Sequence, residues 1–297
     1  MLIRVGFEID VESAPQVPML LALSTHGELT NRVIGHDTVR VEPFTPSEVY
    51  YDRFNNRITR IVAQGGTTRL WSDSVIEVSG APDEVDPTAW QIDVQNLPHE
   101  VLSYLVPSRY CDSDNLTAAA WGNFSGYPQG WARVQAITDF VHNHIAFGYQ
   151  FGRTNKTASD VYRERTGVCR DFAHLAIALC RAMNIPARYV SGYLGDIGVP
   201  YQGAGDFCAW FEVYLGGRWL TLDARYNTPR IGRVPMVRGC DAADVAMITS
   251  FGEHKLTYFR VWSDEVQGAP SDADVLAMLQ TRPQGAPLVY PSSGRVA

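Results

Sequence analysis

The stretch that decides the fold runs from residue 157 to 194 and reads "TASDVYRERTGVCRDFAHLAIALCRAMNIPARYVSGYL". Gly167 is placed to stop one helix, and the residues from Cys169 to Met183 are almost continuously apolar beyond their first turn. Such a pattern predicts a helix buried on most of its sides, because few polar groups are left to face water. Pro186 ends it, and the residues that follow predict a strand.

The first hundred residues show the alternation typical of half-buried antiparallel strands. At the start of the chain, the apolar residues that share one face of an extended segment are Ile3, Val5, Phe7, Ile9 and Val11. We therefore expect an N-terminal β-sandwich over residues 1–100. The periodicity of residues 131–145 predicts an amphipathic helix, so we place a core domain of helices on an antiparallel sheet at 101–262. Residues 263–297 are expected to form a tail with one short helix, and the fold class is α+β.

Composition narrows the classes of partner and compartment. The chain has 297 residues, 45% of them hydrophobic, and a formal net charge of −7 without a basic run. That balance argues against nucleic acid or an anionic membrane as a partner. No run approaches the roughly 20 apolar residues of a membrane span. The five cysteines form no CxxC pair, which is typical of a reducing compartment, so we expect a cytoplasmic protein without a cofactor or metal.

Cys169 stands where the buried helix is predicted to begin. The unpaired N–H groups and the positive end of the helix dipole favour a thiolate there over a thiol. The same N–H groups can face a developing oxyanion, so one position provides both a better nucleophile and part of the transition-state stabilisation. A cysteine that only packs at a helix start explains this stretch equally well.

Two motifs favour a catalytic role for Cys169 over a purely structural one. The Gly-x-Cys at 167–169 and the Asn-Ile-Pro-Ala-Arg-Tyr-Val at 184–190 resemble the core of the transglutaminase-like superfamily of cysteine acyl-transferases and peptidases. The segment "AWFEVYLGGRWLTLDA" at 209–224 is similar to the second signature of that superfamily. More loosely, the first hundred residues resemble the β-rich region found before this domain in bacterial transglutaminase-like proteins. The resemblance implies a papain-like fold in which Cys169 attacks a peptide or protein amide, a histidine accepts its proton and Asp223 orients that histidine.

The residues themselves predict part of this geometry. Gly216-Gly217 is a strong two-residue hairpin signal between two strand-like segments. If the chain turns there, Leu215 pairs with Arg218, Trp210 with Asp223 and Cys208 with Arg225. Position 208 and Asp223 then lie on one face of the sheet as diagonal neighbours, roughly 7 to 8 Å apart. The opposite face carries the apolar residues of the first strand and is expected to face the core.

Cys208 departs from the superfamily pattern, because the residue before Ala-Trp is ordinarily the catalytic histidine. A cysteine cannot relay between a thiol and a carboxylate, and it holds no positive charge that would lower the pKa of Cys169. His174 lies too far around the helix and is expected to pack in the core. His254 is the one histidine that we keep as a replacement. We therefore expect an incomplete triad of Cys169, Cys208 and Asp223.

Three functions follow. The first is cysteine-dependent acyl transfer or amide hydrolysis at Cys169, impaired by the missing histidine. The second is a non-catalytic domain that binds a peptide or protein in the same groove. The third is a redox or zinc site at Cys169 and Cys208. Trp210 and Arg170 flank these residues, and we predict that they contact substrate.

Overall fold

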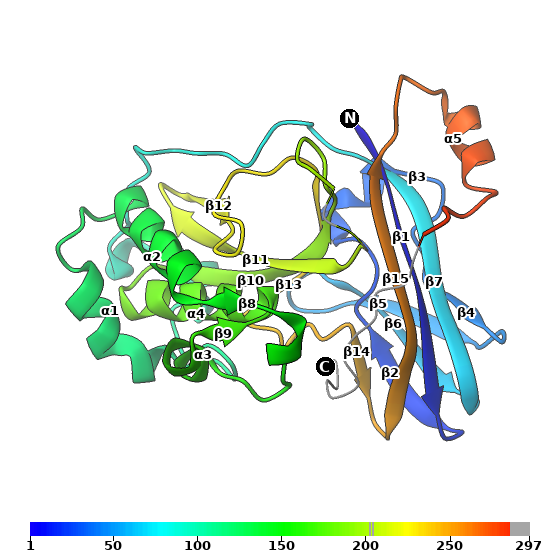
Figure 1. The fold of residues 1–297 in the computed structure, drawn as a ribbon, viewed down its shortest axis with the longest axis horizontal. Helices are drawn as coiled ribbons and strands as arrows, with labels where there is room; N and C mark the ends of the chain where they lie inside the picture. The colour runs from blue at the N-terminus through cyan, green and yellow to red at the C-terminus, as the bar shows by residue number, and fades with distance from the viewer. Residues whose placement is uncertain (202, 204, 286–297) are drawn as a thin grey trace.

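The computed structural model describes residues 1–201, 203 and 205–285. Figure 1 shows helices gathered at one end of the molecule, two sheets at the other end and a further sheet between them. The two ends of the described chain contribute to the same sheet-rich end, and the middle of the chain forms the helical end.

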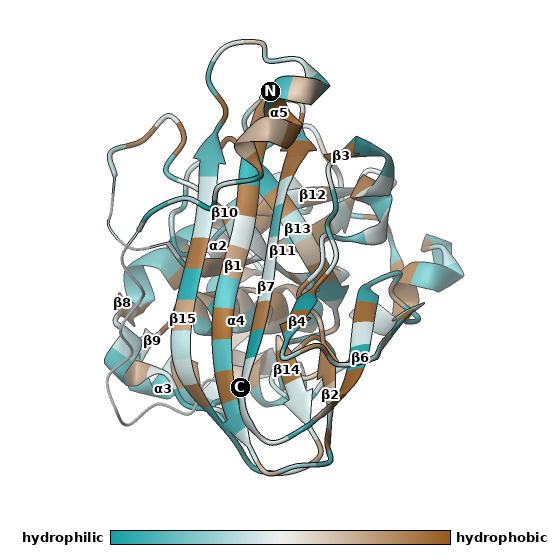
Figure 2. Cartoon of the chain, turned by 90° about the vertical axis from the view of Figure 1, so that its right-hand side faces the viewer, coloured by the Kyte–Doolittle hydropathy of each residue, from teal (hydrophilic) through white to brown (hydrophobic). Residues whose placement is uncertain are grey.

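One sheet of the sandwich has the order β15-β1-β7-β3, with β4 also paired to β7. Its strands are β1 (Leu2–Ser13), β3 (Val33–Ile34), β4 (Arg40–Glu42), β7 (Gly66–Glu77) and β15 (His254–Glu265). The alternation predicted for β1 is confirmed, since its five apolar residues are all buried. Figure 2 shows the same hydrophilic and hydrophobic alternation along the strand.

The second sheet has the order β14-β2-β6-β5 and completes the predicted sandwich. Its strands are β2 (Val17–Leu21), β5 (Ser47–Tyr51), β6 (Arg57–Ala63) and β14 (Ile248–Ser250). Both β14 and β15 follow the core domain in the chain. The boundary predicted at residue 262 therefore falls inside β15, which pairs with β1 along its whole length. The predicted division into folding units remains a prediction, but the sandwich uses strands from both sides of the core.

The central sheet has the antiparallel order β12-β11-β10-β13. Its strands are β10 (Ala187–Leu194), β11 (Phe207–Leu215), β12 (Arg218–Leu222) and β13 (Arg233–Gly239). The predicted register is confirmed at the hairpin, where Leu215 pairs with Arg218. Gly216 and Gly217 both have positive φ, the conformation that a two-residue hairpin turn requires and that glycine adopts without a steric penalty. A short parallel pair, β8 (Ala146–Phe147) with β9 (Thr166–Gly167), lies beside the helices.

Helix α4 (Cys169–Ala182) is the centre of the helical end. It contacts β10 and β11 on one side and helices on the others, which explains its nearly uniform apolar sequence. The surrounding helices are α1 (Thr117–Phe124), α2 (Trp131–His144) and α3 (Ala158–Glu164). The short 3-10 helices are Gly27–Arg32, Val94–Asn96, His99–Tyr104, Ser113–Leu116 and Tyr149–Phe151. The predicted α+β class, with helices packed on an antiparallel sheet, is confirmed.

The predicted tail helix is α5 (Asp272–Met278). Val275 of this helix is buried, and Arg4 of β1 donates a hydrogen bond of 2.6 Å to the carbonyl of Thr281. This part of the tail is therefore held against the first sheet of the sandwich, as Figure 2 shows. Residues 286–297 of the predicted tail lie outside the described residues.

Candidate active site

The start of α4 is fixed by its own first turn. Asp171 is fully buried, and its Oδ2 accepts a hydrogen bond of 2.9 Å from the N–H of Val168. Gly167 lies so close that a Cβ there would meet the Asp171 side chain at 2.6 Å. Only glycine therefore lets the chain enter the helix at this point, and Cys169 becomes the first residue of the helix, as predicted.

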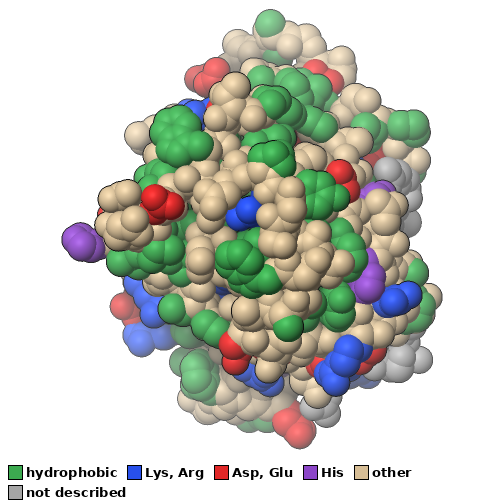
Figure 3. Space-filling model, turned by 90° about the vertical axis from the view of Figure 1, so that its left-hand side faces the viewer, with side chains coloured by type: hydrophobic (Ala, Val, Ile, Leu, Met, Phe, Trp, Pro, Cys, Tyr) green, Lys and Arg blue, Asp and Glu red, His purple; other side chains and the backbone are tan. Residues whose placement is uncertain are grey.

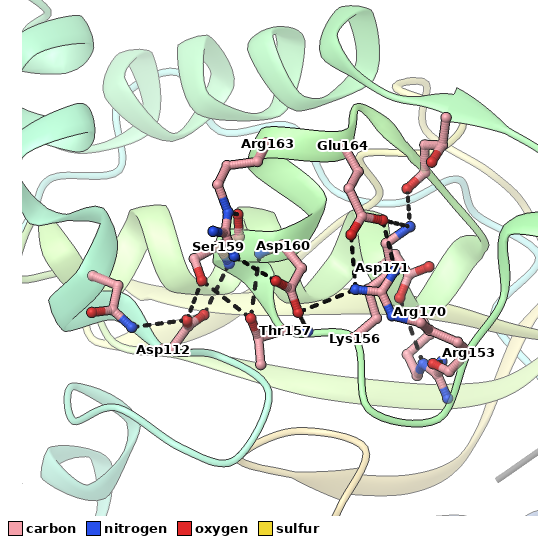
Figure 4. Close-up of polar contacts among 12 residues, drawn as sticks. Asp112, Arg153, Lys156, Thr157, Ser159, Asp160, Arg163, Glu164, Arg170 and Asp171 are labelled. Carbon is pink, nitrogen blue, oxygen red and sulfur yellow. Dashed lines mark hydrogen bonds and ion pairs between the residues drawn. The ribbon is translucent and has the colours of Figure 1, made fainter.

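A polar network holds the segment that leads into α4 (Figure 4). Lys156 is buried and donates to the carbonyl of Thr166 at 2.5 Å while it pairs with Glu164 at 3.2 Å. Arg153 pairs with the same Glu164, and its carbonyl accepts a hydrogen bond of 2.7 Å from Arg170. The guanidinium of Arg170 is thus directed to the backbone of this segment. Its predicted contact with substrate stays a prediction.

Asp223 follows β12 and is buried. Its Oδ1 accepts from the N–H groups of Arg225 at 2.9 Å and Tyr226 at 3.2 Å, which closes a tight turn. Its Oδ2 accepts from Arg233 at 3.0 Å. The guanidinium of Arg233 also lies over the ring of Trp210, at 4.9 Å from the ring centre. The carboxylate that would orient an imidazole is therefore occupied by an arginine that the sequence analysis did not select.

The two sulfurs meet beside this turn. Cys169 packs against a small buried cluster that contains Cys208 and Trp210. The Cys208 thiol, more than any other group, and the backbone N–H of Ala209 both act to lower the pKa of Cys169. That N–H is available because the pairing of β11 with β12 ends at Phe211 and Leu222. The structure thus brings together the three residues predicted as a triad, although the bond partners differ from those of a triad.

Arg225 supplies the positive charge that was expected to be absent. Its Nη1 lies 3.9 Å from the sulfur of Cys208, and its guanidinium lies over the ring of Phe147, at 3.7 Å from the ring centre. The hydrogen bond from Cys208, opposed by burial and assisted by Arg225, lowers the pKa of Cys169. The same hydrogen bond, together with burial, raises the pKa of Cys208. The expectation that Cys208 leaves Cys169 without a cation is therefore wrong. The predicted register had already placed Arg225 opposite Cys208, and that pairing was the signal for it.

The two histidines considered as replacements lie elsewhere, whereas His142 of α2 bonds through Nδ1 to the carbonyls of Ala224 and Arg225, at 3.2 and 3.0 Å. His174 is completely buried between the rings of Tyr110 and Tyr189, and its Nε2 accepts a hydrogen bond of 3.2 Å from the N–H of Ala242. Burial lowers its pKa to about 3. His254 stands at the start of β15 and bonds to Ser250 at 2.6 Å. Within residues 1–201, 203 and 205–285, no histidine forms a hydrogen bond with Cys169, Cys208 or Asp223. The proposed replacement by His254 is therefore not supported.

Comparison with known proteins supports the fold in which these residues lie. The family model of the transglutaminase-like superfamily core matches residues 121–224. The chain has a transglutaminase-like core. The solved structure of a proposed cysteine protease from Cytophaga hutchinsonii aligns with a TM-score of 0.79 and 28% identity, over 91% of this chain and 92% of that one. The predicted resemblance is confirmed.

Curated relatives match smaller shares of this chain. An uncharacterized protein of Mycobacterium leprae is 26% identical over 64% of this chain and 70% of its own length. An uncharacterized protein of Mycobacterium tuberculosis is 40% identical over 38% of this chain, and the match spans 40% of that protein. The kyphoscoliosis peptidase of the mouse is 24% identical over 49% of this chain and 20% of its own length. These alignments support the core rather than any specific activity.

Several hollows adjoin the core, and the largest of those described here has Cys208, but not Cys169, in its wall. A groove of about 470 Å³ lies between α1 and α2, at the end of the molecule shown in Figure 3, where apolar side chains are spread over the surface between acidic and basic ones. A larger cleft of about 820 Å³ lies between residues 194–208 and β15, and Cys208 and Arg225 form part of its wall. We take the larger cleft as the candidate entry for substrate, because it reaches the chemistry.

Trp210 is only 2% exposed and lies behind this wall, so its predicted contact with substrate also stays a prediction. All five cysteines are free thiols. In the described part of the chain, no three His, Cys, Asp or Glu side chains are grouped as metal ligands, so the zinc interpretation finds no ligand set there. No described helix is long and apolar enough to cross a membrane.

Proposed function

We propose that this protein carries out cysteine-dependent acyl transfer or hydrolysis, with Cys169 as the nucleophile and a peptide or protein acyl donor. One observation carries the proposal. Cys169 is the first residue of α4 and packs against Cys208, and the guanidinium of Arg225 lies 3.9 Å from the Cys208 sulfur. Each of these contacts favours the thiolate, which is the nucleophilic form of cysteine.

The relatives support the same class of chemistry. The transglutaminase-like core covers both motifs that contain the sulfurs, and a structural neighbour at 28% identity is named as a proposed cysteine protease. We extend that chemistry to this chain because Cys169 occupies the helix start that a nucleophile requires. Free thiols and the cysteine pattern also lead us to propose the cytoplasm as its compartment.

Turnover of amides is proposed to be slow. Asp223 is engaged by Arg233 and backbone N–H groups, so the carboxylate stabilises the turn after β12 and orients no imidazole. Loss of a general acid–base group commonly costs about 10² to 10⁴ in rate without loss of binding. Cys208 is assigned a different role, as a hydrogen-bond donor that holds the thiolate of Cys169.

Trapping of an acyl-enzyme tests the proposal. The purified protein is incubated with a peptide acyl donor, and the mass of the intact chain is measured with time. We expect one acyl adduct on Cys169, loss of the adduct in Cys169→Ala, and no loss in the matched control Cys240→Ala, because Cys240 lies in a loop outside the site. An adduct that persists in Cys169→Ala contradicts the proposal.

Peptide binding without turnover is the second candidate, and the engagement of Asp223 by Arg233 favours it. If it is correct, a peptide binds wild type and Cys169→Ala with equal affinity, and no adduct accumulates on either. Cys208→His separates the two candidates further. A large gain in amide turnover shows that the remaining machinery is intact, whereas an unchanged absence of turnover favours binding alone.

A further inference from the structure

We propose that the site selects acyl donors whose leaving group departs as an anion, thioesters above all, in preference to amides. This inference rests on the proposed function and names its substrate class. It follows from how protons are distributed around the two sulfurs.

The attacking group needs no base in this arrangement. Cys169 stands at the start of α4 and packs against Cys208, and Arg225, 3.9 Å from the Cys208 sulfur, is fixed against Phe147 beside them. A thiolate held in this way attacks a carbonyl carbon directly. The missing imidazole therefore does not block the first half of the reaction.

Departure of an amine does require a proton donor, because an amide nitrogen leaves only after it is protonated. Cys208 carries a proton beside the reacting sulfur, and the neighbouring Cys169 together with burial raises the pKa of Cys208. Tyr226, on the same turn, has its pKa raised to about 12, mainly by burial. The Arg225 guanidinium remains protonated throughout. None of these groups gives up a proton readily near neutrality.

A thiolate leaving group avoids this requirement. Cys169 forms a bond to the carbonyl carbon, the tetrahedral intermediate collapses, and the bond to the donor sulfur breaks with its electron pair. The acyl group is then on Cys169 and the product is a free thiolate, with no proton transferred and nothing oxidised. Arg225 forms part of the cleft wall and offers a fixed positive charge to the departing anion. Water or a primary amine then takes the acyl group, releases the thiolate of Cys169 and loses its proton to solvent.

A matched pair of substrates tests the inference. The same acyl peptide is prepared as an alkyl thioester and as an alkyl amide, and kcat/KM is measured for both with wild type and Cys208→His. Restoring an imidazole is expected to raise the amide rate about 10²-fold more than the thioester rate, because only the amide lacks a proton donor. Equal gains for both substrates overturn the inference.

If Cys208→His does not fold, a series of substrates with different leaving groups tests the inference in the wild-type protein. Aryl esters of one acyl peptide are compared as the pKa of the phenol rises. A steep fall in kcat/KM is expected when the phenolate leaves unassisted, whereas a flat profile overturns the inference. The proposed function is checked separately, since Cys169→Ala must abolish every one of these rates. If it does and the profile is flat, only the substrate class is wrong.

Discussion

Cys208 and Glu212 lie on the same face of β11, yet their surroundings differ. Glu212 is buried between two arginines, with Arg188 at 2.5 Å and Arg238 at 3.0 Å from its carboxylate. Although burial opposes it, these arginines lower the pKa of Glu212. Cys208 shares one arginine with a second thiol and borders a cleft. We call Glu212 with its two arginines the closed cluster, because its charges are paired and buried. We call Cys169, Cys208 and Arg225 the open cluster, because one cation serves two thiols beside a cleft.

The closed cluster also joins the two ends of the molecule. Arg238 bonds to the ring of His26 at 3.1 Å and pairs with Glu28 at 2.9 Å, and both of these residues precede the sandwich strand β3. The N–H of His26 donates to the carbonyl of Pro235 in β13 at 2.9 Å. Glu212 thus stabilises the contact between the sandwich and the central sheet. The open cluster has no such structural role, and the two are expected to respond differently to substitution.

The largest effect is expected at the closed cluster. Glu212→Ala leaves Arg188 without its carboxylate and Arg238 with only the more exposed Glu28, and we expect a loss of about 3–5 kcal/mol of unfolding free energy. Urea unfolding monitored by fluorescence measures this change. The matched control is Glu48→Ala, which removes the exposed partner of Arg60 and should cost less than about 1 kcal/mol. Equal losses in the two variants would mean that the Glu212 cluster is not closed.

The second largest loss of stability is expected when Arg233, which pairs with both Asp223 and Asp83, is replaced. Arg233→Met removes the cation from Asp223 and from Asp83, and we expect a loss of about 2 kcal/mol, since hydrogen bonds to charged groups contribute about 1.5–3 kcal/mol. Thermal unfolding measures it. Arg218→Met, which breaks the surface pairs of a half-exposed arginine with Glu84 and Asp86, serves as the control and should lower the melting temperature less than Arg233→Met does.

Arg225→Met is expected to change reactivity more than stability. Removing the cation disfavours the thiolate, so the pKa of Cys169 rises and alkylation by iodoacetamide at pH 7 slows about tenfold. The midpoint of the pH profile of alkylation should move to higher pH by as much as the pKa of Cys169 rises. Arg109→Met, at an exposed arginine over Tyr110, is the matched control. A profile that does not move shows that Arg225 has no part in holding the thiolate.

The smallest effect is expected on the pH dependence of stability, and it comes from the buried imidazole of His174. The pKa of His174 is lowered to about 3 by burial, so the unfolded chain takes up a proton below about pH 6.5 while the folded chain does not. Stability therefore falls as the pH decreases from 6.5, by up to about 1.4 kcal/mol per pH unit. His174→Gln should flatten this dependence in urea unfolding between pH 6.5 and 5.5. An identical slope in both proteins would assign the acid sensitivity to other groups.

Sequence reasoning reached the fold and the position of Cys169 at a helix start because both depend on local signals. The glycine pair at 216–217 fixed the register of β11 and β12, and Gly167 with the apolar run placed Cys169 at the start of α4. The roles of Arg225 and Arg233 were missed. A strand register says which residues are opposite one another, but it does not say where a long, flexible side chain ends.

By itself, the sequence determined an α+β chain with a transglutaminase-like core. It also determined a cysteine at the start of a buried helix and the lack of a histidine before Ala-Trp. These features were readable because hydrophobic periodicity, turn residues and motifs are local properties. Only the tertiary structure decided that Cys169 packs against Cys208 beside the cation of Arg225, that Asp223 is bound to Arg233, and that β15 joins the sandwich. Charge and hydrogen bonding depend on distances between residues far apart in the chain, and those distances are set by packing.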